Sequence, residues 1–152
     1  MQPITLLTAS YNSAATIGDT LKSVARQSYP NIEHIIIDGG SKDDTMAVVA
    51  RDGGHVARAV SEKDKGIYDA YNKGIGMASH DVIGFINSDD FYAHDGVIAE
   101  VMEAFAADPE LEAVHADLVY VKQDDTGKIV RHWKSRPCTE ASLSRGFIPA
   151  HP

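Results

Sequence analysis

Short apolar segments alternate along the chain with longer segments in which apolar residues recur every three or four positions. The short segments are rich in β-branched residues, as is typical of strands, and the uninterrupted Ile35-Ile36-Ile37 predicts a strand covered on both faces. The longer segments predict helices; Ser13 is the expected N-cap of the first, which should stop near Tyr29. The expected strands are residues 4–9, 32–37, 55–61, 81–86, 111–121 and 128–133, and the other expected helices are residues 43–51, 67–77 and 96–107.

Strands that alternate with helices are typical of a sheet built from βαβ units. The sequence therefore predicts the α/β class, with a mostly parallel sheet, helices on both of its faces and a buried fourth strand. Residues 123–127 are polar and suit a hairpin turn between the last two strands. We expect this hairpin to add an antiparallel edge to the sheet.

Length and charge narrow the class of protein. A chain of 152 residues has the size of one domain. The net charge of -8 argues against a nucleic-acid partner and against a basic face for anionic lipid. Cys138 is the single cysteine, so the chain has no disulfide framework and no thiolate zinc site. This cysteine usage fits a reducing compartment, so we expect a cytoplasmic protein. No apolar run reaches membrane-spanning length, which is compatible with work at the inner face of a membrane without crossing it.

Polar residues follow four of the expected strands, at the point where each strand ends. Ligands of open parallel sheets bind beyond the carboxyl ends of the strands, so these loops should meet at one rim. They are residues 8–12, 38–41, 61–66 and 87–90.

Two adjacent carboxylates, Asp89 and Asp90, follow the fourth strand. They repel each other and lose hydration unless a cation or hydrogen-bond donors compensate. Oxygen ligands favour Mg²⁺ or Mn²⁺, which often complete their shells with substrate phosphates. The alternative interpretation is a solvated acidic turn, and Asp38 before two glycines is equally compatible with a simple turn.

Other chemistries lack their motifs. The histidines show no paired ligand spacing, and Cys138 has no recognisable nucleophile context. The first strand is not followed by a Gly-x-Gly-x-x-Gly motif, and no Gly-Lys-Ser/Thr phosphate loop occurs. Classical dinucleotide dehydrogenases and P-loop proteins are therefore disfavoured.

Several blocks together resemble family-2 glycosyltransferases. They are Ile4-Thr5-Leu6-Leu7-Thr8-Ala9-Ser10-Tyr11-Asn12, Gln27-Ser28-Tyr29-Pro30-Asn31, residues 35–45, residues 62–74 and Gly84-Phe85-Ile86-Asn87-Ser88-Asp89-Asp90. The resemblance implies the Rossmann-like GT-A fold of nucleotide-diphospho-sugar transferases. It also implies an inverting single displacement from a UDP-sugar or dTDP-sugar donor, with Mn²⁺ or Mg²⁺, to a glycan or lipid-linked acceptor in polysaccharide biosynthesis of the cell envelope.

The resemblance also assigns residues. The family's Asp-x-Asp element falls on Asn87-Ser88-Asp89, so asparagine replaces the first acid and the implied metal ligands are Asp89 and Asp90. Asp38 would hold the pyrimidine ring. The full set implied to bind the donor is Thr8, Ala9, Ser10, Tyr11, Asp38, Asp64, Lys65, Asn87 and Ser88.

The general base has no clear candidate, because in the family it usually lies beyond the donor half; Asp117 is a weak one. Residues 147–152 resemble the start of an acceptor segment. We therefore expect residues 1–152 to form a single donor-binding domain without its C-terminal acceptor segment. Two alternatives stay open: a non-catalytic nucleotide-sugar binding module, and a nucleotidyltransferase, which the lack of Lys and Arg in residues 10–18 disfavours.

Overall fold

The computed structural model describes residues 1–136, 138–139, 141 and 144–146. The chain divides into two compact units, Met1–Ala107 and Asp108–Pro152, and each is described by itself. No helix in the described part is long and apolar enough to cross a membrane. That all 152 residues form one domain stays a prediction.

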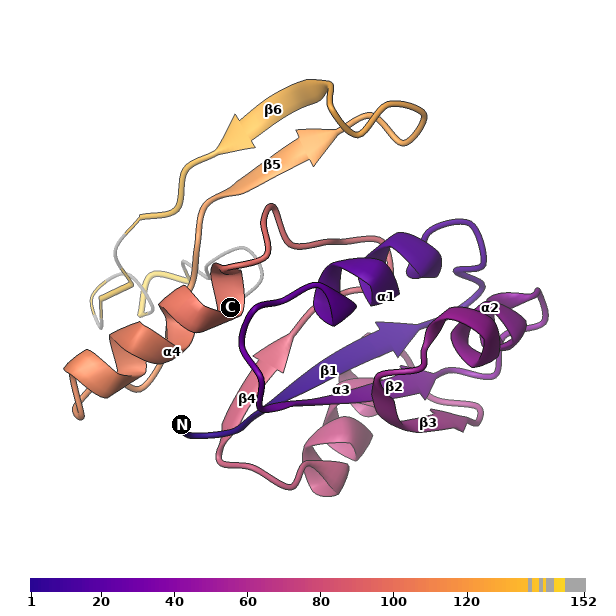
Figure 1. Cartoon of the computed structure of the whole chain (residues 1–152), viewed down its shortest axis with the longest axis horizontal. Helices are drawn as coiled ribbons and strands as arrows, with labels where there is room; N and C mark the ends of the chain where they lie inside the picture. The colour runs from indigo at the N-terminus through magenta and orange to yellow at the C-terminus, as the bar shows by residue number, and fades with distance from the viewer. Residues whose placement is uncertain (137, 140, 142–143, 147–152) are drawn as a thin grey trace. The chain divides into compact units, whose positions relative to one another are not determined.

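The first unit is an α/β layer structure around a four-stranded parallel sheet with strand order β3-β2-β1-β4 (Figure 1). Most predicted elements of this unit are confirmed to within two residues at each end. The elements are β1 (Ile4–Ser10), α1 (Ile17–Ala25), β2 (Ile32–Asp38), α2 (Thr45–Asp52), β3 (Val56–Ser61), α3 (Ile67–Met77), β4 (Val82–Phe85) and α4 (Val97–Ala107).

Strand β1 is central to the sheet. It pairs in parallel with β2, where Ile4 lies opposite Ile32, and with β4, where Ile4 lies opposite Val82. All seven β1 residues are buried. The expectation of a fully buried β4 is wrong: its four residues are only partly buried, because within the described residues β4 pairs on one side alone. Strand order reverses at β1, which puts a topological switch point at its carboxyl end.

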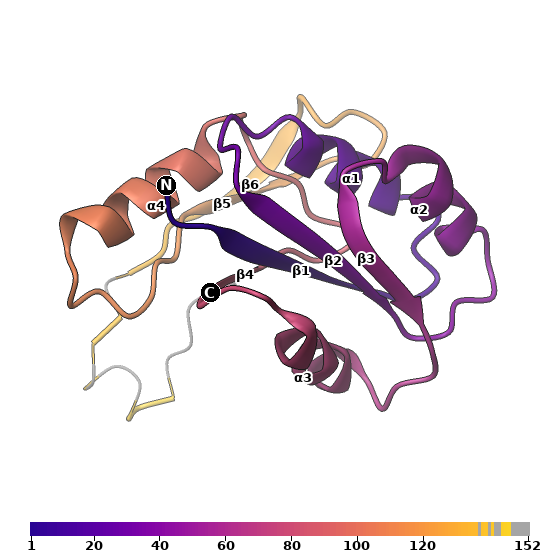
Figure 2. The same cartoon turned by 60° about the horizontal axis from the view of Figure 1, so that its bottom comes forward.

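Helices cover both faces of the sheet. Figure 2 shows α1 and α2 on one face and α3 on the other. Ile36 packs with Ile17 of α1, whereas its neighbours Ile35 and Ile37 pack with Ala70 of α3. The prediction that this isoleucine run is covered on both faces is therefore confirmed.

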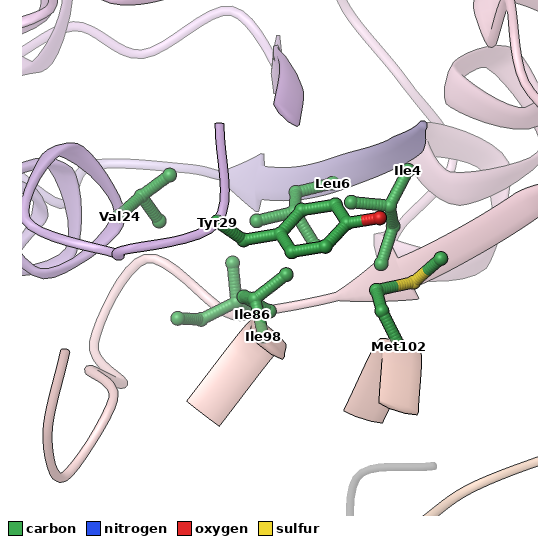
Figure 3. Packing of buried hydrophobic residues seen from close by; sticks show 7 residues of the cluster. All are labelled: Ile4, Leu6, Val24, Tyr29, Ile86, Ile98 and Met102. Carbon is green, nitrogen blue, oxygen red and sulfur yellow. The ribbon is translucent and has the colours of Figure 1, made fainter. Parts of the chain in front are cut away.

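Helix α4 completes the face that α1 covers. Its residues Ile98 and Met102 join a buried cluster with two side chains of β1 (Figure 3). The other members come from α1, from the segment after it and from the end of β4. The cluster is Ile4, Leu6, Val24, Tyr29, Ile86, Ile98 and Met102.

Helix α3 lies close to the sheet because Gly74 faces it. A Cβ atom at Gly74 would lie 2.8 Å from Ile37 Cδ1 and 3.1 Å from Leu7 Cδ1. Both side chains are fully buried. The close contact brings the first half of α3, including Tyr71, toward the carboxyl ends of the strands.

The start of α1 differs from the prediction. Thr16, not Ser13, is the N-cap, and it makes no side-chain cap hydrogen bond. Ser13 instead forms a turn in which its carbonyl oxygen accepts from the backbone N–H groups of Thr16 and Ile17, each at 3.0 Å. Its hydroxyl is paired with Ser88 Oγ at 2.8 Å, so it is not available as a helix cap. The helix also ends earlier than expected, at Ala25 rather than near Tyr29.

The second unit contains the antiparallel hairpin of β5 (Leu118–Val121) and β6 (Ile129–Trp133). The predicted strand over residues 111–121 is too long, because residues 111–117 have no strand partner among the described residues. The expected edge on the main sheet is also wrong: β5 and β6 form a two-stranded sheet of their own. Within the hairpin, the Arg131 guanidinium lies 5.7 Å from the ring centroid of Tyr120 on the opposite strand and 4.9 Å from that of Trp133 on its own strand.

Candidate functional site

An open cleft of about 1130 Å³ lies at the carboxyl ends of the strands in the first unit. The sequence-predicted residues that line it are Ala9, Ser10, Tyr11, Asp64, Asn87, Ser88 and Asp89. Thr8, Asp38, Lys65 and Asp90 are not among its lining residues. Gly39 and Gly40 also line the cleft, so the structure brings together residues from all four of the predicted loops.

Thr8 does not line the cleft; it lies opposite Ile36, on the face of the sheet that α1 covers. It is fully buried, and its Oγ1 lies 2.9 Å from Nε2 of the buried His34. His34 Nδ1 in turn lies 3.1 Å from His55 Nε2. Burial, followed by the nearby His55, lowers the pKa of His34 to about 3, so this imidazole is neutral. Thr8 therefore contributes to the packing behind the cleft.

Asp38 is also fully buried, and its carboxylate accepts hydrogen bonds from protein donors on both oxygens. Ser10 Oγ donates to Oδ1 at 3.2 Å and Ser61 Oγ donates to Oδ2 at 2.6 Å. The backbone N–H groups of Gly40 and Ser41 donate to Oδ2 at 3.1 and 2.9 Å, and the Ser41 hydroxyl donates to Oδ1. These groups tie the ends of β1, β2 and β3 to the loop after β2.

The ionisation of Asp38 follows from this cage. Burial opposes the charge, but the hydrogen bonds from Ser41, Ser61 and Ser10 outweigh it and lower the pKa of Asp38. The charged Asp38 carboxylate therefore holds the ends of β1, β2 and β3 together, next to Ser10, which lines the cleft. Direct contact between Asp38 and a ligand stays a prediction.

The loops after β1 and β2 are tied together at the cleft entrance. Asn12 has a positive φ of 49°, a conformation that asparagine tolerates better than most residues. Its N–H donates to Ser41 Oγ at 2.7 Å, and its Oδ1 accepts from the Lys42 N–H at 2.9 Å. The two loops therefore form one wall.

Asp64 supplies a carboxylate to the cleft lining, beside the loop after β2. A Cβ atom at Gly39 would lie 2.7 Å from Asp64 Oδ2, so only glycine lets this carboxylate approach the loop after β2. Asp64 Oδ1 accepts from the Gly66 N–H at 2.9 Å. Lys65 is exposed beside it, and its N–H donates to Asp69 Oδ2 at 3.1 Å.

The segment after β4 is held from two helices. Thr20 Oγ1 of α1 donates to the carbonyl oxygen of Asp90 at 2.7 Å. The Tyr71 hydroxyl of α3 donates to Asn87 Oδ1 at 2.6 Å, and Asn87 Nδ2 donates to Asp90 Oδ2 at 2.9 Å. Burial, and then the charges of Asp90 and Asp89, raise the pKa of Tyr71 to about 12, which keeps its hydroxyl protonated. Sequence reasoning missed Tyr71, whose helix position carries no sign of this contact.

Only one of the two predicted metal ligands lines the cleft. Asp89 is exposed and lines it, whereas the Asp90 carboxylate accepts from Asn87. Within the described part of the chain, no three His, Cys, Asp or Glu side chains gather closely enough to hold a metal ion. The donor set therefore fits a hard cation that takes one carboxylate and completes its shell with ligand phosphates and water.

Two lysines that the sequence reasoning did not single out also line the cleft, Lys42 and Lys63. Their two positive charges equal the two negative charges of Asp64 and Asp89 in the cleft lining. The described lining is therefore neutral, although the chain has a net charge of -8. Both lysines lie in loops that follow strands, and this placement is the signal that could have identified them.

Sequence comparisons identify relatives of this chain. The model of the family described as Glycosyl transferase family 2 matches residues 5–150. An uncharacterised glycosyltransferase of Mycobacterium tuberculosis is 40% identical over 104 residues, which are 68% of this chain and 40% of that protein. The poly-beta-1,6-N-acetyl-D-glucosamine synthase of Staphylococcus aureus is 33% identical over 116 residues, which are 75% of this chain and 28% of that protein. The chain thus spans less than half the length of these relatives.

Solved structures share the fold. S. aureus TarS in complex with UDP-GlcNAc is 20% identical, with a TM-score of 0.64 over 70% of this chain and 32% of that one. The mannosyltransferase PcManGT of Pyrobaculum calidifontis, in complex with GDP-Man and Mn²⁺, is 24% identical, with a TM-score of 0.67 over 80% of this chain and 36% of that one. These likenesses confirm the predicted fold class.

Proposed function

The chain belongs to glycosyl transferase family 2 and has the GT-A fold, and from this premise we propose that its cleft binds the nucleotide-sugar donor of an inverting, metal-dependent glycosyltransferase. The donor is a UDP-sugar or a dTDP-sugar. The acceptor is a glycan or a lipid-linked glycan, and the product belongs to a polysaccharide of the cell envelope. The polymer-forming S. aureus relative supports this class of product.

The observation that carries the proposal is the position of Asp89. It presents an exposed carboxylate to the cleft, beyond the switch point of the sheet and in the same lining as Lys42 and Lys63. A nucleoside diphosphate in this cleft brings negative charge to a chain of net charge -8. Asp89 would hold a divalent cation, and such a cation would supply positive charge against the phosphates and against the charge that grows on the leaving group.

In the proposed reaction, the acceptor hydroxyl oxygen forms a bond to the anomeric carbon while the bond from that carbon to the phosphate oxygen breaks. The nucleoside diphosphate leaves with the electron pair, and the hydroxyl proton goes to a general base. The first unit supplies the donor side of this reaction. Asp117 stays only a weak candidate for the base; its Oδ1 accepts from the Ser135 N–H at 2.8 Å.

Calorimetric titration of the chain with UDP and with dTDP tests the proposal, in Mn²⁺ or Mg²⁺ and then in excess chelator. We expect binding that depends on metal. Asp89→Asn should weaken it at least tenfold, or about 1.4 kcal/mol, because the cation loses its protein carboxylate. Asp124→Asn, at an exposed position in the hairpin turn, is the matched control and should bind as the wild type does.

The same titrations separate the predicted ligands. Asp90→Asn should have a weaker effect than Asp89→Asn if Asp90 acts only through Asn87. Equal affinities in metal and in chelator, together with an unchanged Asp89→Asn variant, would overturn the proposed donor site.

A further inference from the structure

We propose that Tyr71 and Asn87 are positioning residues that hold the segment of residues 87–90 in the conformation that binds a metal-bound nucleoside diphosphate. This inference rests on the proposed function. Tyr71 does not line the cleft; it reaches the segment from behind, out of α3. Its role would therefore be exerted through Asn87 and not by contact with the ligand.

The hydrogen bonds define the orientation of the Asn87 amide. The Asp90 carboxylate can only accept, so the Asn87 group that faces it at 2.9 Å must be the Nδ2 donor. The Asn87 Oδ1 then faces Tyr71, whose hydroxyl donates to it at 2.6 Å. Tyr71, Asn87 and Asp90 thus form one chain of donors and acceptors with a single direction.

These hydrogen bonds explain why position 87 is an asparagine, where the family's Asp-x-Asp element has its first aspartate. A carboxylate at position 87 would face the Asp90 carboxylate at hydrogen-bond distance without a proton to share, and like charges at that distance repel. The neutral amide instead joins Tyr71 to Asp90. The charge of the segment is thereby presented to the cleft by Asp89.

Neighbouring contacts keep the hydroxyl of Tyr71 in place. Its ring packs edge-on against Phe85 of β4, with centroids 4.7 Å apart at 73°. On the other side of the segment, Ser13 Oγ contacts Ser88 Oγ and Thr20 donates to the Asp90 carbonyl. The turn itself is closed by the Asp90 N–H, which donates to the Asn87 carbonyl oxygen at 3.1 Å. The segment is therefore clamped between α1 and α3.

Tyr71→Phe tests the proposal because it removes the hydroxyl and keeps the ring against Phe85. We expect UDP affinity in Mn²⁺ to fall by about five- to tenfold, as loss of one hydrogen bond allows, with metal-free UDP affinity unchanged. In the chain without ligand, the Asp90 amide should exchange its hydrogen about fivefold faster, since the turn opens more easily. The split between metal-dependent and metal-free affinity separates positioning from general loss of stability.

Tyr29→Phe is the matched control. Tyr29 is a buried tyrosine of the core cluster whose hydroxyl donates to the Gln2 carbonyl oxygen, so its variant also loses one hydrogen bond. It should change neither UDP affinity nor exchange at Asp90. Wild-type affinity in Tyr71→Phe, or unchanged exchange at Asp90, would overturn the positioning role. A wild-type chain that binds neither UDP nor dTDP in Mn²⁺ would overturn the proposed function, and exchange at Asp90 would then alone decide the role of Tyr71 in the turn.

Discussion

A single buried carboxylate, Asp38 of β2, joins the ends of three strands through its hydrogen bonds to Ser10 of β1 and Ser61 of β3. Its place before two glycines is compatible with a simple turn, and the family resemblance implies that it holds the pyrimidine ring of the donor. The structure shows a fully buried carboxylate whose two oxygens both accept from protein donors. The sequence could predict the position of Asp38 at the rim. It could not predict the donors, because Ser10 and Ser61 become neighbours of Asp38 only through the register of β1, β2 and β3.

The cage around Asp38 predicts a stability effect. Asp38→Asn removes the charge that these donors stabilise and leaves one accepting oxygen where the carboxylate has two. We expect the free energy of unfolding to fall by about 2 to 3 kcal/mol, measured by urea denaturation at neutral pH. Asp44→Asn is the control, because Asp44 is exposed and makes no cap hydrogen bond. Equal stabilities of these two variants would contradict the structural role of Asp38.

His34 predicts a dependence of stability on pH. Its pKa is about 3 in the folded chain and near 6.5 in the unfolded chain, so between these values the unfolded chain binds the extra proton. Stability is therefore complete above pH 6.5 and falls by about 1.4 kcal/mol per pH unit below it. Burial lowers the pKa of His55 as well, which adds an effect of the same sign. The lowered pKa of Asp38 also costs stability as the pH falls, but only as the pH approaches the ordinary aspartate value of 3.8.

Urea denaturation at pH 7 and pH 5 checks this expectation. The wild type should lose roughly 2 kcal/mol between the two values, and His34→Gln should lose clearly less. His132→Gln, at an exposed position in the second unit, is the control and should follow the wild type. A wild type with equal stability at both values would contradict a neutral His34 in the folded chain.

At the scale of elements, local pattern predicted existence and type well. Helix α3 was predicted at residues 67–77 and is found there, because Lys65-Gly66 breaks the chain before it and its apolar spacing is regular. The strand over residues 111–121 failed because a strand needs a partner, and only residues 118–121 find one in β6. Local sequence carries no information on which distant segment offers that partner.

Two glycines of α3 give a paired test of packing against helix propensity. Gly76→Ala should stabilise the chain by about 0.5 to 1 kcal/mol, because an alanine Cβ there meets nothing within 4 Å. Gly74→Ala gains the same propensity but places its Cβ against Ile37 and Leu7. Overpacking at that site should cost about 1 to 3 kcal/mol. Chemical denaturation of both variants measures the difference, and a stabilised Gly74→Ala would show that α3 lies farther from the sheet.

At the scale of the whole molecule, the cleft and the single tryptophan lie in different units. Among the described residues, those that line the cleft all belong to the first unit, and the single tryptophan, Trp133, lies in the hairpin of the second. The four loops that meet at the cleft could be predicted, since parallel strands end on one edge. The hydrogen bond between Asn87 and the Asp90 carboxylate could not be predicted, because it depends on the orientations of the Tyr71 and Asn87 side chains, and no periodicity encodes them.

Ligand binding should therefore change thermal unfolding in a specific way. UDP at about 100 times its dissociation constant, in Mn²⁺, should add about 2.7 kcal/mol to the stability of the unit that binds it. We expect a higher midpoint in far-ultraviolet circular dichroism, which reports the helices of the first unit. Trp133 fluorescence on the same samples reports the second unit, and a coincident shift would support a single cooperative domain. An unchanged dichroism midpoint at saturation would contradict binding in the cleft.

The pairing of β1 with β4 has a consequence for synthesis on the ribosome. Strands β1, β2 and β3 follow one another, but Ile4 pairs with Val82, which is translated 78 residues later. Non-local strand pairs form slowly, and domains fold as units while the chain emerges. In a nascent chain whose residues Asn87 and Asp89 have not yet left the ribosome, the edge of β1 that later pairs with β4 is still unpaired. The part of the cleft lining that follows β4 is also missing. The pairing of β4 with β1 thus covers this edge and completes the cleft in one late step. A nucleotide that contacts both walls of the cleft can bind only chains in which β4 has already paired.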